Sequence, residues 1–472
     1  MWRIFRVLAV ASGCLLLARI SAAANPLGPL AGIANRYKMP AQSISALVQD
    51  VVSARPLLAI NAQVPRNPAS TLKLLTTFVA LDTLGPIYAW RTEVYALGPI
   101  NKGVLKGDLL LKGFGDPYLL EDQLWQLLGE LRRKGVQRIT GDLVIDDSHF
   151  APPASDPAAF DGQAYRLYNV LPNALQINFK AVTFIFTPRA DGQGVLVRTN
   201  PELPNLKITN QLQLERGRCR GVLATVQLRV PDPVAADAVV LSGRYQTGCG
   251  EQTLPRTLLT PASYAYGLFR RLWAQWGGVL EGGVRRGVQP APTRPLLVWH
   301  SPPLAELIRP LNKWSNNVMA DALFYTLGGT QFEPPLRPEH AASVVKSYLT
   351  QHRIPTAGFV MENGSGLSRV TRITAQTLHD VLHQAYHSKY MPEYLASLSI
   401  VGVDGTLRRR LKGGAETGWM HLKTGHLNNV AAVAGYVRAQ SGKTYAVVLF
   451  VNGATGGSNA LFDTFLRWVY RQ

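Results

Sequence analysis

The sequence Asn-Pro-Ala-Ser-Thr-Leu-Lys occupies residues 67–73 and leads into an apolar run that ends at Leu84. Because residues three positions apart share one face of a helix, Ser70 and Lys73 are expected to lie in contact. A serine hydroxyl becomes a nucleophile when a base removes its proton, and a lysine serves as that base once its ammonium is neutral. Free backbone N–H groups at the start of a helix also favour an oxyanion. The stretch therefore suggests a catalytic serine.

The spacing of Ser70 and Lys73 is not specific by itself, because Ser343 and Lys346 repeat it. The second pair is typical of an exposed helix face, and we assign it no role. Only the first pair precedes two further polar motifs that acyl transfer requires, so the order of motifs along the chain selects Ser70.

Those two motifs can supply a route that returns the proton to the leaving group, and charged and polar groups that bind the substrate and the oxyanion. Ser315 and Asn317 stand two residues apart in a polar bend, where a hydroxyl and an amide can aim at one point. A Lys-Thr-Gly triplet at residues 423–425 comes just before a strand expected over residues 430–438. Its cation and hydroxyl can hold a carboxylate, and its glycine permits close backbone approach.

Composition indicates a folded protein of two or three compact units. The chain has 472 residues, of which 47% are hydrophobic and 17% are charged, and this argues against disorder. The net charge of +19 suggests an anionic polymer nearby, such as cell wall or a membrane surface. The basic residues are scattered without interleaved aromatics, so we do not expect nucleic-acid binding.

The N-terminus is predicted to be an export signal. Arg3 and Arg6 precede an apolar stretch over residues 7–17, and Ala-Ala-Ala at residues 22–24 offers a cleavage site. We expect removal of residues 1–24 and a periplasmic mature protein with no membrane span. An uncleaved anchor or a lipid on Cys14 is the alternative.

Two cysteines remain after such cleavage, Cys219 and Cys249. An even count in an oxidising compartment suggests one disulfide, with a free pair as the alternative. Closing this loop would stabilise the fold by about 3–4 kcal/mol.

We predict no metal and no cofactor. His379 and His383 have the spacing of a zinc-binding helix, but Asp380 stands where a zinc peptidase has the glutamate that acts as general base. Polar histidines on a surface helix explain the pattern better.

Periodicity predicts one α/β unit built from both ends of the chain and interrupted by a β-rich insert. Strands are expected at 44–51, 56–60, 430–438 and 444–451, and helices at 304–327, 339–351, 374–386 and 459–470. Within the insert, strands are expected at 104–112, 138–145, 175–186, 222–230 and 238–245, and helices at 122–134 and 263–276.

The three motifs together resemble the penicillin-binding protein superfamily of serine acyltransferases. The separation of Ser70 from Ser315 is far larger than class A β-lactamases allow. This layout is similar to the low-molecular-mass class C penicillin-binding proteins, the D-alanyl-D-alanine carboxypeptidase/endopeptidase family. Further stretches agree with that family, at residues 54–58, 111–117, 362–369 and 403–407. One departure is Asn363, where the family usually has aspartate before Gly-Ser-Gly.

The resemblance implies a multidomain α/β (α+β) fold. A β-lactamase-like transpeptidase unit, with an antiparallel sheet flanked by helices, would be interrupted by an insert of one or two subdomains. The expected ranges are 25–90 with 300–472 for the catalytic unit, 91–118 with 200–299 for one insert subdomain, and 119–199 for the other.

The resemblance also implies a mechanism. Ser70 would attack the carbonyl of the penultimate D-Ala with Lys73 as base, and water would hydrolyse the acyl-enzyme. A second cation, Lys423, is expected to lower the pKa of Lys73. Ser315 would pass a proton to the departing amine, and Asn317 would orient the substrate amide.

The resemblance assigns the remaining substrate contacts to the Lys-Thr-Gly triplet and the backbone near it. Lys423 and Thr424 would bind the terminal carboxylate beside Gly425. The backbone N–H groups of Ser70 and His426 would form the oxyanion hole.

Two more residues are implied for the diaminopimelate side chain of a peptidoglycan peptide. Arg369 would bind its carboxylate, the alternative being a structural ion pair, and Asp161 would receive its amine. The same chemistry would cut D-Ala–diaminopimelate cross-links, and β-lactams would acylate the enzyme. The alternatives are a serine β-lactamase, disfavoured by the motif spacing and the missing glutamate loop, and a non-catalytic peptidoglycan-binding protein.

Overall fold

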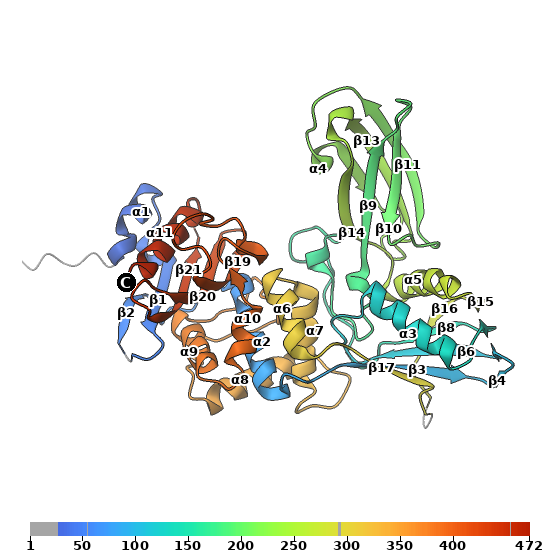
Figure 1. Cartoon of the computed structure of the whole chain (residues 1–472), viewed down its shortest axis with the longest axis horizontal. Coiled ribbons are helices and arrows are strands. Elements are labelled where there is room, and N and C mark those ends of the chain that lie inside the picture. Colours follow the sequence, from blue (N-terminus) through green and yellow to red (C-terminus); the bar gives the residue numbers. More distant parts are fainter. Residues whose placement is uncertain (1–26, 54, 291–293, 454) are drawn as a thin grey trace, which may run out of the picture.

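The two ends of the chain build one antiparallel sheet of six strands (Figure 1). The structure, a computed structural model, describes residues 27–53, 55–290, 294–453 and 455–472. The predicted signal peptide and Cys14 lie outside this part of the chain. The strand order is β18 (Ser399–Ile400), β19 (Met420–Leu427), β20 (Val430–Arg438), β21 (Thr444–Asn452), β1 (Ile44–Asp50) and β2 (Pro56–Ile60). Because β1 pairs with β21 along its whole length, the N-terminal hairpin completes a C-terminal sheet, as predicted.

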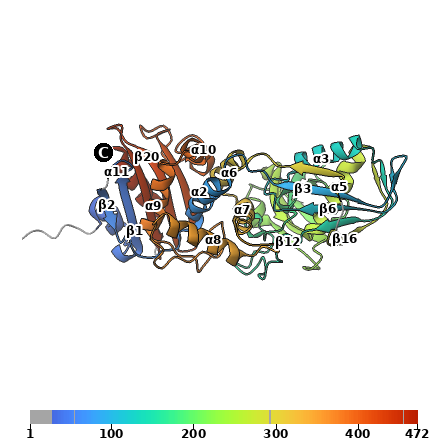
Figure 2. The same cartoon turned by 90° about the horizontal axis from the view of Figure 1, so that it is seen from below.

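Helices cover both faces of this sheet (Figure 2). One face packs against α1 (Ala31–Arg36) and α11 (Ser458–Tyr470). The other face supports α2 (Leu72–Leu84), α6 (Leu304–Lys313), α7 (Asn317–Gly328), α8 (Pro338–Gln351), α9 (Ala375–Tyr386) and α10 (Met391–Ser397). Every residue of α2 from Leu72 to Leu81 is buried, because the helix is mostly apolar around its circumference and occupies the centre of this layer. Among the described residues, no helix is both long and apolar enough to cross a membrane.

Two helices, α6 and α7, occupy the range 304–327 where one helical stretch was expected, because the backbone turns between them. Ser315 has a left-handed backbone with φ of +58°. Asn316 then caps α7 by accepting a hydrogen bond from the Met319 N–H. The break between the two helices coincides with the polar bend expected at Ser315 and Asn317, which the single helical range over residues 304–327 did not mark.

The described residues of the insert form four smaller sheets. Beside the catalytic unit lies a five-stranded sheet of β16 (Val284–Arg286), β8 (Leu143–Asp146), β6 (Asp108–Gly113), β3 (Arg91–Leu97) and β17 (Leu297–His300). A four-stranded sheet combines β15 (Val279–Leu280), β7 (Arg138–Ile139), β5 (Val104–Leu105) and β4 (Ile100–Asn101). Two helices, α3 (Glu121–Arg133) and α5 (Pro261–Gln275), pack together over the five-stranded sheet.

The other two sheets form a separate lobe, drawn at the upper right of Figure 1. Its strands are β9 (Ala181–Pro188), β10 (Val195–Asn200), β11 (Lys207–Glu215), β12 (Val226–Arg229), β13 (Ala238–Gln246) and β14 (Gln252–Thr257). A short helix, α4 (Val222–Thr225), precedes β12, so the strand expected over residues 222–230 begins later than predicted. Cys219 and Cys249 form a disulfide in this lobe.

Strand pairing divides the insert differently from the expected ranges. β8, expected in the second subdomain, pairs with β6 of the first, whereas all strands from 181 to 257 belong to the lobe. The strand expected from residue 175 begins only at Ala181. Asn178, Phe179 and Lys180 have left-handed φ values of 46°, 52° and 55°, and such a turn cannot continue a strand.

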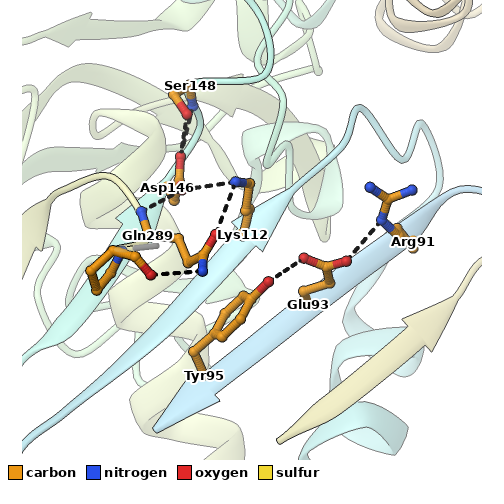
Figure 3. A network of polar contacts seen from close by, with 8 residues as sticks. Arg91, Glu93, Tyr95, Lys112, Asp146, Ser148 and Gln289 are labelled. Carbon is orange, nitrogen blue, oxygen red and sulfur yellow. Dashed lines mark hydrogen bonds and ion pairs between the residues drawn. The ribbon is translucent and has the colours of Figure 1, made fainter. Parts of the chain in front are cut away.

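The face of the five-stranded sheet opposite α3 and α5 carries two groups of polar contacts (Figure 3). Glu93 accepts hydrogen bonds from Arg91 and from the Tyr95 hydroxyl. Lys112 lies 3.6 Å from a carboxylate oxygen of Asp146. One face of the sheet is therefore covered by apolar packing, and the other carries polar pairs beside a small apolar cluster of Tyr95, Leu110 and Val144.

Candidate active site

Ser70 lies in a tight turn that leads into α2. The turn covers Ala69–Thr71, and Ala69 adopts a left-handed φ of +45°. Two glycines make room for it. A Cβ on Gly425 would lie 2.8 Å from the Ser70 backbone nitrogen, and one on Gly366 would lie 2.0 Å from the Ala69 carbonyl oxygen. No side chain fits at either position, so the serine turn is held between β19 and the Gly-Ser-Gly loop.

Lys73 contacts Ser70 as the helical spacing predicts. Its Nζ lies 3.0 Å from the Ser70 Oγ, and it donates hydrogen bonds to Asn317 Oδ1 at 2.7 Å and to the Ser365 carbonyl oxygen at 2.6 Å. A neutral amine has two N–H groups and one lone pair. Since the two carbonyl-type acceptors take both N–H groups, the lone pair is left to face the serine hydroxyl.

Burial lowers the pKa of Lys73 to about 7, while the nearby carboxylate of Asp321 opposes this shift. Lys423, the second cation that was expected from the sequence to lower this pKa, is not among its causes. Lys73 is fully buried and loses the hydration that stabilises an ammonium. The pKa of Lys423 is itself lowered, first by burial and then by the charge of Lys73.

Ser315 and the Lys-Thr-Gly motif meet on the other side of the site. Lys423 Nζ donates to Ser315 Oγ at 2.8 Å and to the Thr424 carbonyl oxygen at 2.6 Å. Because Ser315 accepts this hydrogen bond, its own O–H can point toward a leaving group. Asn317 Nδ2 donates to the Tyr168 carbonyl oxygen at 3.0 Å, which fixes the amide orientation.

The Lys-Thr-Gly motif precedes the expected strand β20, and it lies within a further strand, β19, that was not predicted from the sequence. β18 pairs with β19 only at Leu422 and His421, so the edge beyond these residues has no neighbouring strand in the described chain. An extended peptide can add to such an edge through main-chain hydrogen bonds. His426 follows on the same strand and is exposed, and its place in an oxyanion hole stays a prediction.

A cavity of about 670 Å³ adjoins the site, between a loop of the insert and the catalytic helices, and Arg369 lines it. The Arg369 guanidinium lies over the Phe160 ring, 4.3 Å from its centroid, and has no ion pair with any described carboxylate. Asp161 accepts three hydrogen bonds from its own loop: from Tyr168, from Asn169 and from the Gln163 backbone. These leave Asp161 little free capacity for a substrate amine.

Three residues with contacts in the site were not identified from the sequence. Asp321 lies one helical turn after Asn317, and this i,i+4 spacing could have indicated it. Ser365 supplies a backbone carbonyl, for which no sequence signal exists. Tyr168 comes from the insert, and nothing in the sequence places it beside α7.

The rings of His379 and His383 on α9 are stacked, and that of His383 is tilted against the ring of His387, the C-cap residue. The ring centroids of His383 and His387 lie 4.6 Å apart, and His387 Nε2 is 2.9 Å from the Val51 carbonyl oxygen. Within the described ranges, no three His, Cys, Asp or Glu side chains are grouped so that they could hold a metal ion.

The fold and the site define a class of protein. A sheet with helices on both faces, and a serine at the start of the central helix, are typical of the penicillin-binding proteins and β-lactamases.

The sequence profile of the D-Ala-D-Ala carboxypeptidase 3 (S13) family matches residues 30–462. A D-alanyl-D-alanine carboxypeptidase from Actinomadura sp. (strain R39) is 31% identical over 408 residues, 82% of this chain and 74% of the relative. D-alanyl-D-alanine carboxypeptidase DacB from Haemophilus influenzae is 28% identical over 82% of this chain and 81% of its own length. The crystal structure of penicillin binding protein 4 (dacB) from Haemophilus influenzae is similar with a TM-score of 0.80 at 23% identity, covering 94% of this chain and 99% of that one.

The chain therefore belongs to the D-Ala-D-Ala carboxypeptidase 3 (S13) family. It is a D-alanyl-D-alanine carboxypeptidase, a serine peptidase among the low-molecular-mass penicillin-binding proteins. This assignment favours a peptidase over the β-lactamase and the non-catalytic binding protein that the sequence left as alternatives.

The pH dependence of acylation is expected to follow Lys73. Its pKa is about 7, so below this pH the amine is increasingly protonated and cannot accept the serine proton. The acylation rate should fall about tenfold per pH unit on the acid side and level off above about pH 7. Stopped-flow measurement with a fluorescent penicillin checks this. A rate that does not change between about pH 5 and about pH 7 would contradict Lys73 as the base.

Proposed function

We propose that this enzyme removes the terminal D-Ala of peptidoglycan stem peptides and cuts D-Ala–diaminopimelate cross-links through an acyl-enzyme on Ser70. The observation that carries the proposal is the 3.0 Å contact between Lys73 Nζ and Ser70 Oγ, with both N–H groups of the neutral amine otherwise engaged. The site thus has a nucleophile and a base in hydrogen-bonding contact before substrate arrives.

In the acylation step, Lys73 takes the proton of Ser70 while the serine oxygen bonds to the carbonyl carbon of the penultimate D-Ala. The bond from that carbon to the next nitrogen then breaks, the departing amine takes a proton from Ser315, and the proton that Lys73 accepted returns to Ser315, so that Lys73 is neutral again. Lys423 holds the Ser315 oxygen and keeps it aimed at the leaving group. Water then hydrolyses the ester and restores Ser70.

The substrate would lie along the free edge of β19. Asn317 would orient the substrate amide, and the cation of Lys423 with the Thr424 hydroxyl would hold the terminal carboxylate. The Ser70 backbone N–H, which Gly425 approaches closely, would donate to the oxyanion together with the His426 N–H.

Arg369 is proposed to bind the free carboxylate of the diaminopimelate side chain. Its guanidinium lines the cavity beside the site and has no described acidic partner. Arg369→Ala is expected to lower kcat/KM about tenfold for a peptide with diaminopimelate at its third position, because a charge-assisted hydrogen bond is lost. Little change is expected for a peptide with an uncharged residue there. Arg309→Ala, an exposed arginine of α6, is the matched control, and equal losses for both peptides would contradict this role.

Incubation of the purified enzyme with cross-linked muropeptides, followed by chromatographic separation, tests the whole proposal. Free D-Ala and separated monomers are expected as products. Release of D-Ala without cross-link cleavage would remove the endopeptidase role and leave the carboxypeptidase role intact. We also propose that the protein works in the periplasm after removal of residues 1–24, and N-terminal sequencing of the exported protein tests this.

A further inference from the structure

A second pocket, of about 490 Å³, is lined by residues at the start of α3 and at the end of α5, two helices of the insert. Its apolar lining comes from Leu120 and Leu272, and its aromatic lining is the side chain of Trp125. None of the residues assigned to the peptidase reaction lines it. The volume is within the usual range for small-molecule sites.

Trp125 is an exposed but well-supported aromatic group. Its side chain is 41% exposed, and its ring lies 4.5 Å, centroid to centroid, from that of Trp276. Trp276 is itself fixed, because its Nε1 donates to the Trp125 carbonyl oxygen at 2.9 Å. Gly129 makes room for it, since a Cβ there would lie 2.7 Å from the Trp276 ring. The protein therefore presents a large, rigid aromatic surface to solvent at a pocket wall.

Polar side chains of complementary kinds surround this ring. Gln126, Asn178 and Gln275 offer amides that both donate and accept, and Asp122 offers acceptors. The carboxylate of Glu121 is already paired with Arg271 at 2.8 Å. No lysine or arginine lines the described pocket. This chemistry disfavours an anionic ligand, such as a peptide carboxylate.

A neutral, hydroxyl-rich and acetamido-bearing ligand fits these groups. The apolar face of a sugar ring presents C–H groups that pack on the electron-rich face of an indole. The hydroxyl and acetamido groups at the sugar edge can exchange hydrogen bonds with the amides and the carboxylate around it. An anionic sugar would meet Asp122 without a compensating cation.

We propose that this pocket, the α3–α5 pocket, binds a neutral N-acetylglucosamine-containing segment of a β-1,4-linked glycan. The inference rests on the proposed function, because peptidoglycan peptides are attached to such a glycan. Asn178 lines the pocket, and the next residue, Phe179, packs against the core of the catalytic unit. The pocket thus lies at the end of the insert that joins the catalytic unit, where a glycan held by the insert can present its attached peptide to the active site.

Calorimetric titration of the full-length Ser70→Ala protein with chitotetraose tests binding without catalysis. Trp125→Ala in this background is expected to weaken the affinity about tenfold or more. The matched control is Trp419→Ala, because Trp419 is similarly exposed, at 47%, on the catalytic unit. Failure of the parent to bind, or equal binding by Trp125→Ala, would overturn the inference. If Trp125→Ala does not fold, Gln126→Ala with Gln275→Ala carries the same test.

Activity measurements with native Ser70 separate this inference from the proposed function. Trp125→Ala should lower kcat/KM about tenfold for intact, glycan-linked peptidoglycan and leave kcat/KM unchanged for a short peptide ending in D-Ala-D-Ala. Equal effects on both substrates would contradict a glycan site. D-Ala release without chitotetraose binding would refute the inference alone. Chitotetraose binding without D-Ala release from any substrate would refute the proposed function alone.

Discussion

Ser70→Ala is expected to abolish covalent labelling by a fluorescent penicillin. The substitution removes the only atom proposed to form the acyl bond, whereas the fold, the carboxylate-binding groups and Lys73 remain. By analogy with other serine hydrolases, loss of the nucleophile lowers the rate about 10⁶-fold, which corresponds to about 8 kcal/mol of transition-state stabilisation. Gel fluorescence after long incubation measures it directly.

The chain provides a matched control for this experiment. Ser343→Ala removes the serine of the second Ser-x-x-Lys pair, which lies on α8 with Ser343 and Lys346 both exposed. This variant should be labelled like the parent protein. Thermal unfolding of Ser70→Ala should differ little, because within the described part of the chain the Ser70 side chain makes one hydrogen bond, to Lys73. Persistent labelling of a folded Ser70→Ala protein would show that another residue is the nucleophile.

Local spacing explains why so much of the site could be predicted from the sequence. The Ser70–Lys73 contact is an i,i+3 pair, and any helix starting at this point brings the two together. Four strands of the central sheet, β1, β2, β20 and β21, could be predicted equally well, because they are apolar and close to the two ends of the chain, whereas the two-residue β18 and the polar β19 could not. These features depend on residues that are close together in the sequence or on a clear periodic pattern of apolar residues.

Other features depend on contacts between distant segments and could not be predicted. Tyr168 meets Asn317 only because a loop of the insert folds back onto α7. The division of the insert follows from strand pairing such as that of β6 with β8, which apolar runs do not specify. The cause of the lowered pKa of Lys73 is burial on all sides, which depends on the packed fold and not on the nearest charges in the sequence.

Lys73→Met is expected to lower the rate of penicillin acylation about 10²- to 10⁴-fold, the usual contribution of a general base. Methionine is similar in length and volume, so it fills the buried space of the lysine stem. The Ser70 hydroxyl remains, but no lone pair faces it. Single-turnover kinetics with the fluorescent penicillin measures the change, and Lys346→Met on α8 should leave the rate unaltered.

The charges around Lys73 give a second expectation for this variant, on the pH dependence of its residual rate. The charge of Lys73 contributes to the lowered pKa of Lys423, so its removal should raise that pKa. Asp321 loses its neighbouring cation at the same time, and its pKa, already raised by burial, should rise further. The residual activity of Lys73→Met should therefore lack the rise toward about pH 7 that the parent shows. A variant with reduced rate but an unchanged pH profile would show that Lys73 positions Ser70 and that another group accepts its proton.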